Sequence, residues 1–229
     1  MSQRVVVLLS GGLDSTTVLA AALSDGFDVI ALTIDYGQKH RREIQAAKSI
    51  VDHFNVREHR LVRLDLTSIG GSALTDQSIS IPKKREEEEI GSGIPATYVP
   101  ARNTIFLSYA LGLAEATGSA AIYIAANAID YSGYPDCRPE FYEAFREVAR
   151  LGTKRGVEGD NIEIRTPLIS MSKADIVQLG QRLGVPWRLT WSCYEGGAKA
   201  CGVCDSCQLR LKGFREAGIH DPVPYELAG

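Results

Sequence analysis

The chain lacks the features of a membrane-embedded or secreted protein. No stretch of its 229 residues approaches the roughly 18 consecutive apolar residues of a membrane span. Its first residues lack the basic region, apolar core and cleavage site of a signal peptide. Cysteine is scarce, and five cysteines in a chain of this kind favour a metal site or catalysis over disulfides. We therefore expect a protein of the reducing cytoplasm.

The chain also lacks a strong charge bias, an internal repeat and a low-complexity tail. Its formal net charge is −3 and its pI is about 5.9, which argues against a non-specific nucleic-acid binder. With 45% hydrophobic and 23% charged residues, the composition is that of an ordinary globular protein. A chain of this length buries roughly 70–75% of its unfolded surface, which is enough for one full core.

Strand and helix patterns alternate along the first two thirds of the chain. The expected strands span residues 5–9, 27–34, 59–64, 121–126 and 162–165. The expected helices span residues 16–23, 39–54, 103–117, 140–151 and 172–183. We expect Asn103 and Ser172 to cap their helices, and Phe141, Phe145 and Val148 to face the core. The alternation predicts an α/β fold, a Rossmann-like parallel sheet flanked by helices.

A short glycine-rich segment, Ser10–Ser15, joins the first strand to the first helix. Such a turn leaves free backbone N–H groups at the helix N-terminus, and together with the helix dipole they form an anion site. Gly11 and Gly12 let the backbone approach an anion closely. The spacing matches neither the G-x-G-x-x-G dinucleotide fingerprint nor the G-x-x-x-x-G-K-[ST] loop. An ordinary βα turn with small residues is the competing interpretation.

A long segment between Gly70 and Ala101 breaks the alternating pattern. Its charge run, residues 83–89, is typical of a solvated loop. A loop of this length in a compact domain is often functional, so residues 76–98 are also a candidate active-site lid. In a parallel sheet, ligands bind beyond the carboxyl ends of the strands. Both Ser10–Ser15 and Asp35–Gln38 lie at such ends.

Four cysteines gather near the C-terminus: Cys193, Cys201, Cys204 and Cys207. Their spacing, with glycine-rich turns between them, suits a closed tetrahedral zinc site. Zinc binds zinc-finger peptides with an apparent ~10–16 kcal/mol, which would make the metal structural here. An iron–sulfur cluster and a redox CxxC pair remain alternatives. We expect a helix at 208–217 after Cys207, while Cys137 lies apart from the four.

The segment Ser10–Ser15 resembles the SGGxDS loop of the PP-loop ATP pyrophosphatases, which grip the β- and γ-phosphates and expose the α-phosphate. The resemblance implies an adenine nucleotide alpha hydrolase-like fold, with ATP and Mg²⁺ as co-substrate. It also implies nucleotide contacts from Leu8, Leu9, Ser10, Gly11, Gly12, Leu13, Asp14, Ser15, Thr16, Thr17 and Val18.

Four further segments make the resemblance more specific. In chain order they are Asp35–Gln38 with His40-Arg41, Val99–Asn103, Asp130–Arg138 and the four cysteines. Over essentially the whole chain this order resembles the 7-cyano-7-deazaguanine synthase family of the queuosine pathway. The family suggests a homodimer that acts on small molecules.

The resemblance implies an ATP-dependent carbon–nitrogen ligase. The carboxylate of 7-carboxy-7-deazaguanine attacks the α-phosphate of ATP, and ammonia, supplied as ammonium, displaces AMP to leave an amide. A second ATP activates the amide oxygen, and loss of AMP gives the nitrile. ATP must carry the oxygen away because each dehydration is uphill in water. Catalysis of this kind consists mostly of positioning and charge neutralisation.

Three catalytic residues are hypotheses that follow from the resemblance. Asp14 would lie near Mg²⁺ and the departing pyrophosphate. Arg102 would reach a phosphate or the substrate carboxylate, unless it forms only a surface salt bridge. Lys173 opens a helix, where a cation is unfavourable unless an anion is near, so it is either a phosphate ligand or simply exposed.

Substrate contacts are a second group of hypotheses. Asp130 could accept hydrogen bonds from the N–H edge of the guanine-like ring, and Tyr131 or Tyr134 could stack on it. All three could instead be turn residues. His40 and Arg41 either lie near the triphosphate or belong to the start of a helix.

We expect two parts in the chain: a PP-loop nucleotide-binding α/β domain over 1–186, and a zinc-binding helical segment over 187–229 that packs on it. A tRNA-thiolating PP-loop enzyme, which would use its cysteines in sulfur transfer, is the main alternative. The acidic charge balance and the short chain argue against it. A nucleotide-binding zinc module without chemistry is a third interpretation.

Overall fold

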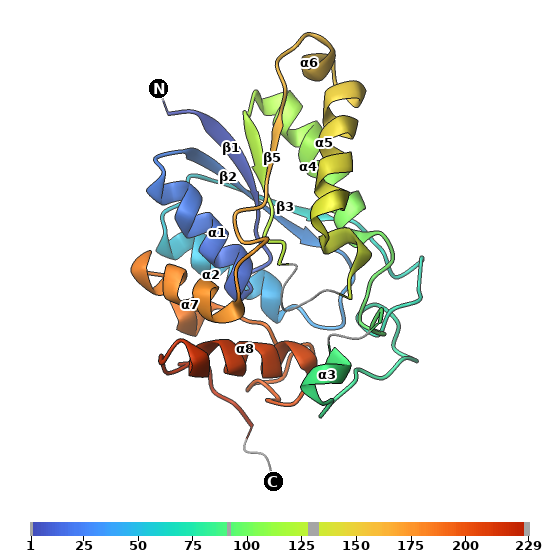
Figure 1. Cartoon of the computed structure of the whole chain (residues 1–229), viewed down its shortest axis with the longest axis vertical. Helices are drawn as coiled ribbons and strands as arrows, with labels where there is room; N and C mark the ends of the chain where they lie inside the picture. The colour runs from blue at the N-terminus through green and yellow to red at the C-terminus, as the bar shows by residue number, and fades with distance from the viewer. Residues whose placement is uncertain (1, 91–92, 128–132, 227–229) are drawn as a thin grey trace.

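The fold is built on one parallel sheet (Figure 1). The computed structural model describes residues 2–90, 93–127 and 133–226. In these ranges the strand order is β3-β2-β1-β4-β5, and every pairing is parallel. The strands are β1 (Arg4–Leu8), β2 (Asp28–Asp35), β3 (Glu58–Arg63), β4 (Ala121–Tyr123) and β5 (Glu163–Arg165). The predicted Rossmann-like sheet is confirmed.

Helices cover both faces of the sheet, which explains why its central strand reads as one continuous apolar run. Val5 and Val7 are fully buried against α1 (Leu13–Ser24), α2 (Arg42–His53) and α7 (Lys173–Arg182). Val6 points the other way, toward α4 (Arg102–Thr117) and α5 (Pro139–Gly152). Figure 1 shows these two helix layers on either side of the strands. No helix in the described ranges is both long enough and apolar enough to cross a membrane.

Two local predictions about helices are wrong, and one is confirmed. Asn103 does not cap α4, because Ala101 precedes the helix and the Asn103 amide donates to the backbone oxygen of Asp136 at 3.0 Å. Val148 is 51% exposed, although Phe145 on the same helix is buried. Ser172 does cap α7, in a reciprocal capping box with Asp175.

The last part of the chain packs under the sheet domain through α8 (Asp205–Glu216) (Figure 1). Phe214 of α8 belongs to the core on the α1 face and meets Trp187 edge-on, with ring centroids 5.3 Å apart. Trp187 lies in the short 3₁₀ turn Trp187–Leu189. Arg210 and Asp221 form a bidentate ion pair with both side chains 4% exposed. This pair fixes the chain after α8 against the body of the protein.

The long segment after Gly70 is attached to the cysteine region. Lys83 forms an antiparallel bridge with Cys204, and the Lys84 N–H donates to the Val203 oxygen at 2.8 Å. The Arg85 guanidinium donates to both oxygens of Asp205. The remaining short elements are α3 (Glu87–Ile90), α6 (Lys154–Val157) and the 3₁₀ turn Pro135–Cys137. Residues 83–85 therefore form part of the packing around the cysteines, and the lid hypothesis for 76–98 stays a prediction.

The buried ion pair gives a stability prediction. Asp221→Asn should destabilise the protein by about 3–5 kcal/mol, because it leaves the Arg210 guanidinium buried without its counter-charge. Denaturant unfolding measures this loss. Glu147→Gln, which breaks the exposed pair with Arg150, should leave the unfolding midpoint unchanged. Equal midpoints for both variants would contradict the assigned role of Asp221.

Candidate functional site

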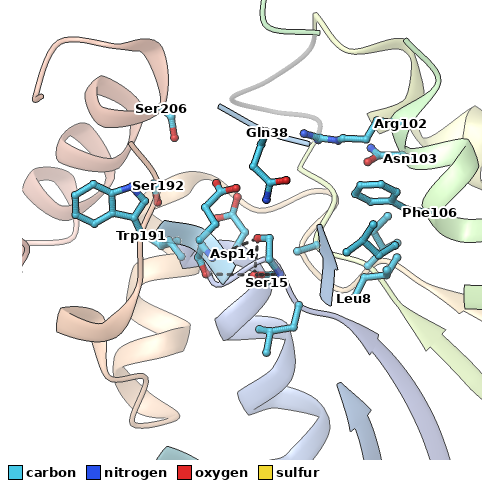
Figure 2. Close-up of a pocket in the computed structure, with 18 of the residues that line it drawn as sticks. Leu8, Asp14, Ser15, Gln38, Arg102, Asn103, Phe106, Trp191, Ser192 and Ser206 are labelled. Carbon is cyan, nitrogen blue, oxygen red and sulfur yellow. Dashed lines mark hydrogen bonds between the residues drawn. The ribbon is translucent and has the colours of Figure 1, made fainter. Parts of the chain in front are cut away.

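A cavity of about 280 Å³ opens at the carboxyl ends of the central strands. Asp14 and Ser15, in the first turn of α1, lie at the base of this cavity (Figure 2). One wall comes from α4. The other comes from residues 191–210, the cysteine-containing segment. The labelled wall residues in Figure 2 are Arg102, Asn103 and Phe106 on the α4 side, and Trp191, Ser192 and Ser206 on the opposite side. Gln38 reaches into the space between the two walls.

The base of the cavity is the predicted glycine-rich turn. Gly12 precedes α1, and no side chain caps the helix start. Ser10 and Ser15 share a hydroxyl hydrogen bond at 3.0 Å, and the Thr16 hydroxyl donates to the Gly12 oxygen at 2.7 Å. These hydroxyls hold the shape of the turn, so the backbone N–H groups at the start of α1 can face an anion in the cavity.

Gly11 is where the turn meets the rest of the protein. Its φ of +86° lies in the left-handed region, which glycine tolerates best. A Cβ atom added there would lie 2.4 Å from the Glu43 backbone oxygen and 2.6 Å from the Ala47 nitrogen. On the other side, the Trp191 N–H donates to the Gly11 oxygen at 2.9 Å. The turn is therefore held between α2 and the cysteine-containing segment.

Lys173 and Asp14 form an ion pair at the cavity. The Lys173 Nζ lies 2.8 and 3.0 Å from the two carboxylate oxygens of Asp14. Lys173 is the first residue of α7, where a cation opposes the helix dipole. The Asp14 carboxylate offsets that cost, and both charges line the space in front of the glycine-rich turn. The anion that we expected near Lys173 is thus the Asp14 carboxylate of the protein itself.

Arg102 lines the cavity at the start of α4. Its guanidinium carbon lies 5.9 Å from the ring centre of Tyr36 and 6.0 Å from that of Phe106. No ion pair joins it to any residue in the described ranges, which disfavours a plain surface salt bridge. Burial raises the pKa of Tyr36 to about 12, with Arg102 opposing the rise, so this hydroxyl remains a hydrogen-bond donor.

Of the predicted ring contacts, Tyr134 is described, whereas Asp130 and Tyr131 lie outside the described residues. Tyr134 lines the cavity, and its hydroxyl lies 2.9 Å from the Thr97 hydroxyl. Cys137 lines the same wall, and the Asn103 amide donates to its sulfur at 3.3 Å. Burial raises the pKa of Cys137 to about 11, so this thiol stays protonated near neutral pH.

His40 and Arg41 take different positions. His40 lines the cavity. Gly196 packs closely on it, and a Cβ atom added to Gly196 would lie 2.1 Å from the His40 Cβ. Burial lowers the pKa of His40, which favours the neutral imidazole. Arg41 is exposed and donates to the Asp35 carboxylate at 3.2 Å. Arg41 thus belongs to the start of α2.

The four C-terminal cysteines come together in space and could hold a metal ion. All four Sγ atoms lie within 4.8 Å of one another, and none forms a disulfide. The Cys201 N–H donates to the Cys193 sulfur at 3.3 Å, and the Cys204 N–H to the Cys201 sulfur at 3.4 Å. Such bonds favour thiolates. The helix begins at Asp205, three residues before the predicted start at Gln208, so Cys207 lies inside its first turn.

The structure adds cavity residues that sequence reasoning missed. Glu43, in the first turn of α2, contributes a carboxylate to the wall. Tyr194, Ser206 and Arg210 come from the cysteine-containing segment and its helix. The helical pattern at 39–54 marked the apolar face of α2 but gave no signal that Glu43 faces a cavity. The cysteine spacing likewise gave no signal that its surroundings line this cavity.

Comparisons with known proteins agree on one family. The family model described as "Queuosine biosynthesis protein QueC" matches residues 4–218. The 7-cyano-7-deazaguanine synthase of Trichodesmium erythraeum is 57% identical over 220 residues, which cover 96% of this chain and 99% of that protein. The synthase of Cellvibrio japonicus is 56% identical over 225 residues, which cover 97% and 98%.

One solved structure bears on the fold alone. The NMN synthetase from Francisella tularensis superposes with a TM-score of 0.50 at 17% identity, and the match covers 96% of this chain and 78% of that chain. This likeness shows that the two proteins share an α/β fold.

The contact at Gly11 gives a second prediction. Gly11→Ala should abolish ATP binding, because the added Cβ overlaps the α2 backbone and pushes the turn out of shape. Gly26→Ala is the matched control, since Gly26 has a φ of +81° and nothing within 4 Å of an added Cβ. Both variants carry the backbone strain, which costs more than about 1 kcal/mol, but only the first carries the overlap. Calorimetric titration with ATP should separate them, and equal ATP affinities would refute the steric argument.

Proposed function

The chain belongs to the queuosine biosynthesis protein QueC family, and from that premise we propose that it is a 7-cyano-7-deazaguanine synthase. The enzyme converts 7-carboxy-7-deazaguanine and ammonium to the nitrile, through an adenylated acid and an amide, and uses ATP at each dehydration. The observation that carries this proposal is the open start of α1 at the base of a cavity that also exposes Arg102, Lys173 and Asp14.

The first step is attack of the substrate carboxylate on the α-phosphate of ATP. The turn from Ser10 to Thr16 binds the β- and γ-phosphates through backbone N–H groups, within the wider contact segment Leu8–Val18. Lys173 exchanges its Asp14 partner for a phosphate oxygen, and Asp14 then becomes available to a cation. The pair thus changes partners without leaving a buried charge unpaired. Asp14 would hold Mg²⁺, which would supply positive charge to neutralise the departing pyrophosphate.

Arg102 acts from the opposite wall. It faces the cavity without a carboxylate partner among the described residues, so its charge is available to the α-phosphate or to the substrate carboxylate. Tyr134 lines the same wall, and this position supports the proposal that its ring stacks on the substrate base. Asp130 and Tyr131 complete the proposed contacts with the deazaguanine base. The side walls shield the acyl adenylate from water, which protects it from hydrolysis.

The cysteine cluster holds a structural zinc ion in this proposal. Four sulfur ligands, closely grouped and mostly buried, match the closed tetrahedral sites that zinc occupies. The zinc would supply no chemistry to the reaction; its role would be to fix the loop that carries Trp191 and Ser192 into the cavity wall. We therefore divide the chain into a nucleotide-binding domain, 1–186, and a zinc-binding segment, 187–229, that completes the site.

Partners and compartment follow from the same proposal. Five free cysteines, four of them as metal ligands, support a reducing cytoplasm. The substrates are small molecules, and the working form is a homodimer. A tRNA-thiolating role is the weaker alternative, since relatives that are 56–57% identical are named 7-cyano-7-deazaguanine synthases and the net charge of −3 does not favour RNA.

The reaction itself provides the main test. Incubation with ATP, ammonium and 7-carboxy-7-deazaguanine should yield the amide and then the nitrile by mass spectrometry. AMP and pyrophosphate should accumulate in step with them, because attack occurs at the α-phosphate. Omission of ammonium is the control and should stop both products. Release of ADP and orthophosphate would contradict the proposed position of ATP.

The zinc assignment gives a separate prediction. Cys204→Ser should lose the bound metal and lower the melting temperature, because it removes one of the four sulfur ligands that would hold the metal. Elemental analysis of the purified protein measures the zinc content. Cys137→Ser, which removes the cysteine outside the cluster, should retain one zinc per chain. Iron in place of zinc, or full zinc occupancy in Cys204→Ser, would contradict the assignment.

A further inference from the structure

Glu43 contributes a carboxylate to the cavity that the steps above do not use. It lies in the first turn of α2 and lines the cavity. The backbone of the same turn touches Gly11, so this carboxylate starts directly beside the phosphate-binding turn. Within the described parts of the chain, no hydrogen bond and no ion pair engages the carboxylate. Burial of a carboxylate without a hydrogen-bond partner is costly, and such a group responds with a shifted pKa.

The surroundings of Glu43 set its protonation. Burial raises the pKa of Glu43 to about 7, and Arg102 on the opposite wall opposes the rise. A carboxyl group with a pKa near the working pH can both accept and release a proton, which is the property of a general base.

Two other titratable groups of the cavity, Tyr36 and His40, are poor proton acceptors near neutral pH. Tyr36, at the end of β2, has its pKa raised and stays protonated. Burial lowers the pKa of His40, which makes this imidazole a weaker base than usual. Asp14, from α1, is paired with Lys173 from α7. In the structure, Asp14 thus already has a cation partner, whereas among the described residues no Lys or Arg forms an ion pair with the Glu43 carboxylate.

Amide formation requires a proton acceptor. Ammonium predominates near neutral pH, but only ammonia has the lone pair that attacks the acyl adenylate. We propose, on the basis of the function proposed above, that Glu43 is a further catalytic residue: its carboxylate binds ammonium beside the phosphate-binding turn and accepts one proton from it.

The bonds and electrons of this step balance. One N–H bond of ammonium breaks, its electron pair remains on nitrogen, and an O–H bond forms on Glu43. The nitrogen lone pair then forms the C–N bond at the acyl carbon, while the C–O bond to the phosphate breaks and AMP leaves with that electron pair. The second excess proton of the nitrogen passes to water. Glu43 returns its own proton to water before the next turnover.

The experiment compares two nitrogen nucleophiles in Glu43→Gln. Glutamine keeps the size of the side chain and removes the base. With ammonium, kcat/KM should fall by about 10²–10⁴-fold. With hydroxylamine, whose nitrogen is already unprotonated near neutral pH, hydroxamate formation should stay close to the wild-type rate. Asp52→Asn, at an exposed carboxylate of the same helix, is the control and should behave as wild type with both nucleophiles.

The pH profile provides a readout that a structural role would not change. In the wild type, kcat/KM for ammonium should rise with pH through about 7, as Glu43 loses its proton. In Glu43→Gln it should instead keep rising in proportion to hydroxide, because only free ammonia then reacts. A variant that keeps the wild-type profile would overturn the proposal.

The remaining outcomes separate this inference from the proposed function. Equal losses with ammonium and hydroxylamine would assign Glu43 to ATP or metal binding and overturn its role as a base. An unchanged rate with ammonium in Glu43→Gln would also overturn the role of Glu43 as a base. If the wild-type protein releases no pyrophosphate with 7-carboxy-7-deazaguanine, the proposed function fails, and this inference fails with it.

Discussion

The close contact between Gly11 and the first turns of α2 is the constraint on which the site depends. Because glycine has no Cβ, the turn after β1 can press against the α2 backbone while it keeps a left-handed φ. The Trp191 N–H holds the same residue from the other side. The start of α1 stays uncapped between these two contacts, and its N–H groups are thereby available to phosphate.

The cysteine-containing segment serves the site as a wall. Several long-range contacts hold it in place, including the bridge from Lys83 to Cys204, the Arg85–Asp205 pair and the buried Arg210–Asp221 pair. Binding of a metal by the cysteines would order this wall together with the loop that carries it. Metal binding by the cysteines would thus be linked to the shape of the cavity through shared packing.

The charges of the cavity are arranged in complementary sets. Lys173 and Asp14 neutralise each other in the free protein and can exchange partners when phosphate and a cation arrive. In the proposed mechanism, Arg102 meets a developing negative charge and Glu43 a positive one. Such an arrangement would suit a reaction that must stabilise pyrophosphate and also release ammonia from ammonium, within one cavity of about 280 Å³.

The sequence by itself determined features that depend on near neighbours: the buried central strand Val5–Leu8, the glycine-rich turn, the Ser172 cap and the grouping of four cysteines. Only the tertiary structure decided that Asn103 bonds to Asp136 instead of capping its helix, that Val148 faces solvent, and that Glu43 faces the cavity. The reason is physical. Periodicity and capping act over a few residues, whereas burial, partner choice and the pKa of Glu43 depend on segments that are distant in sequence.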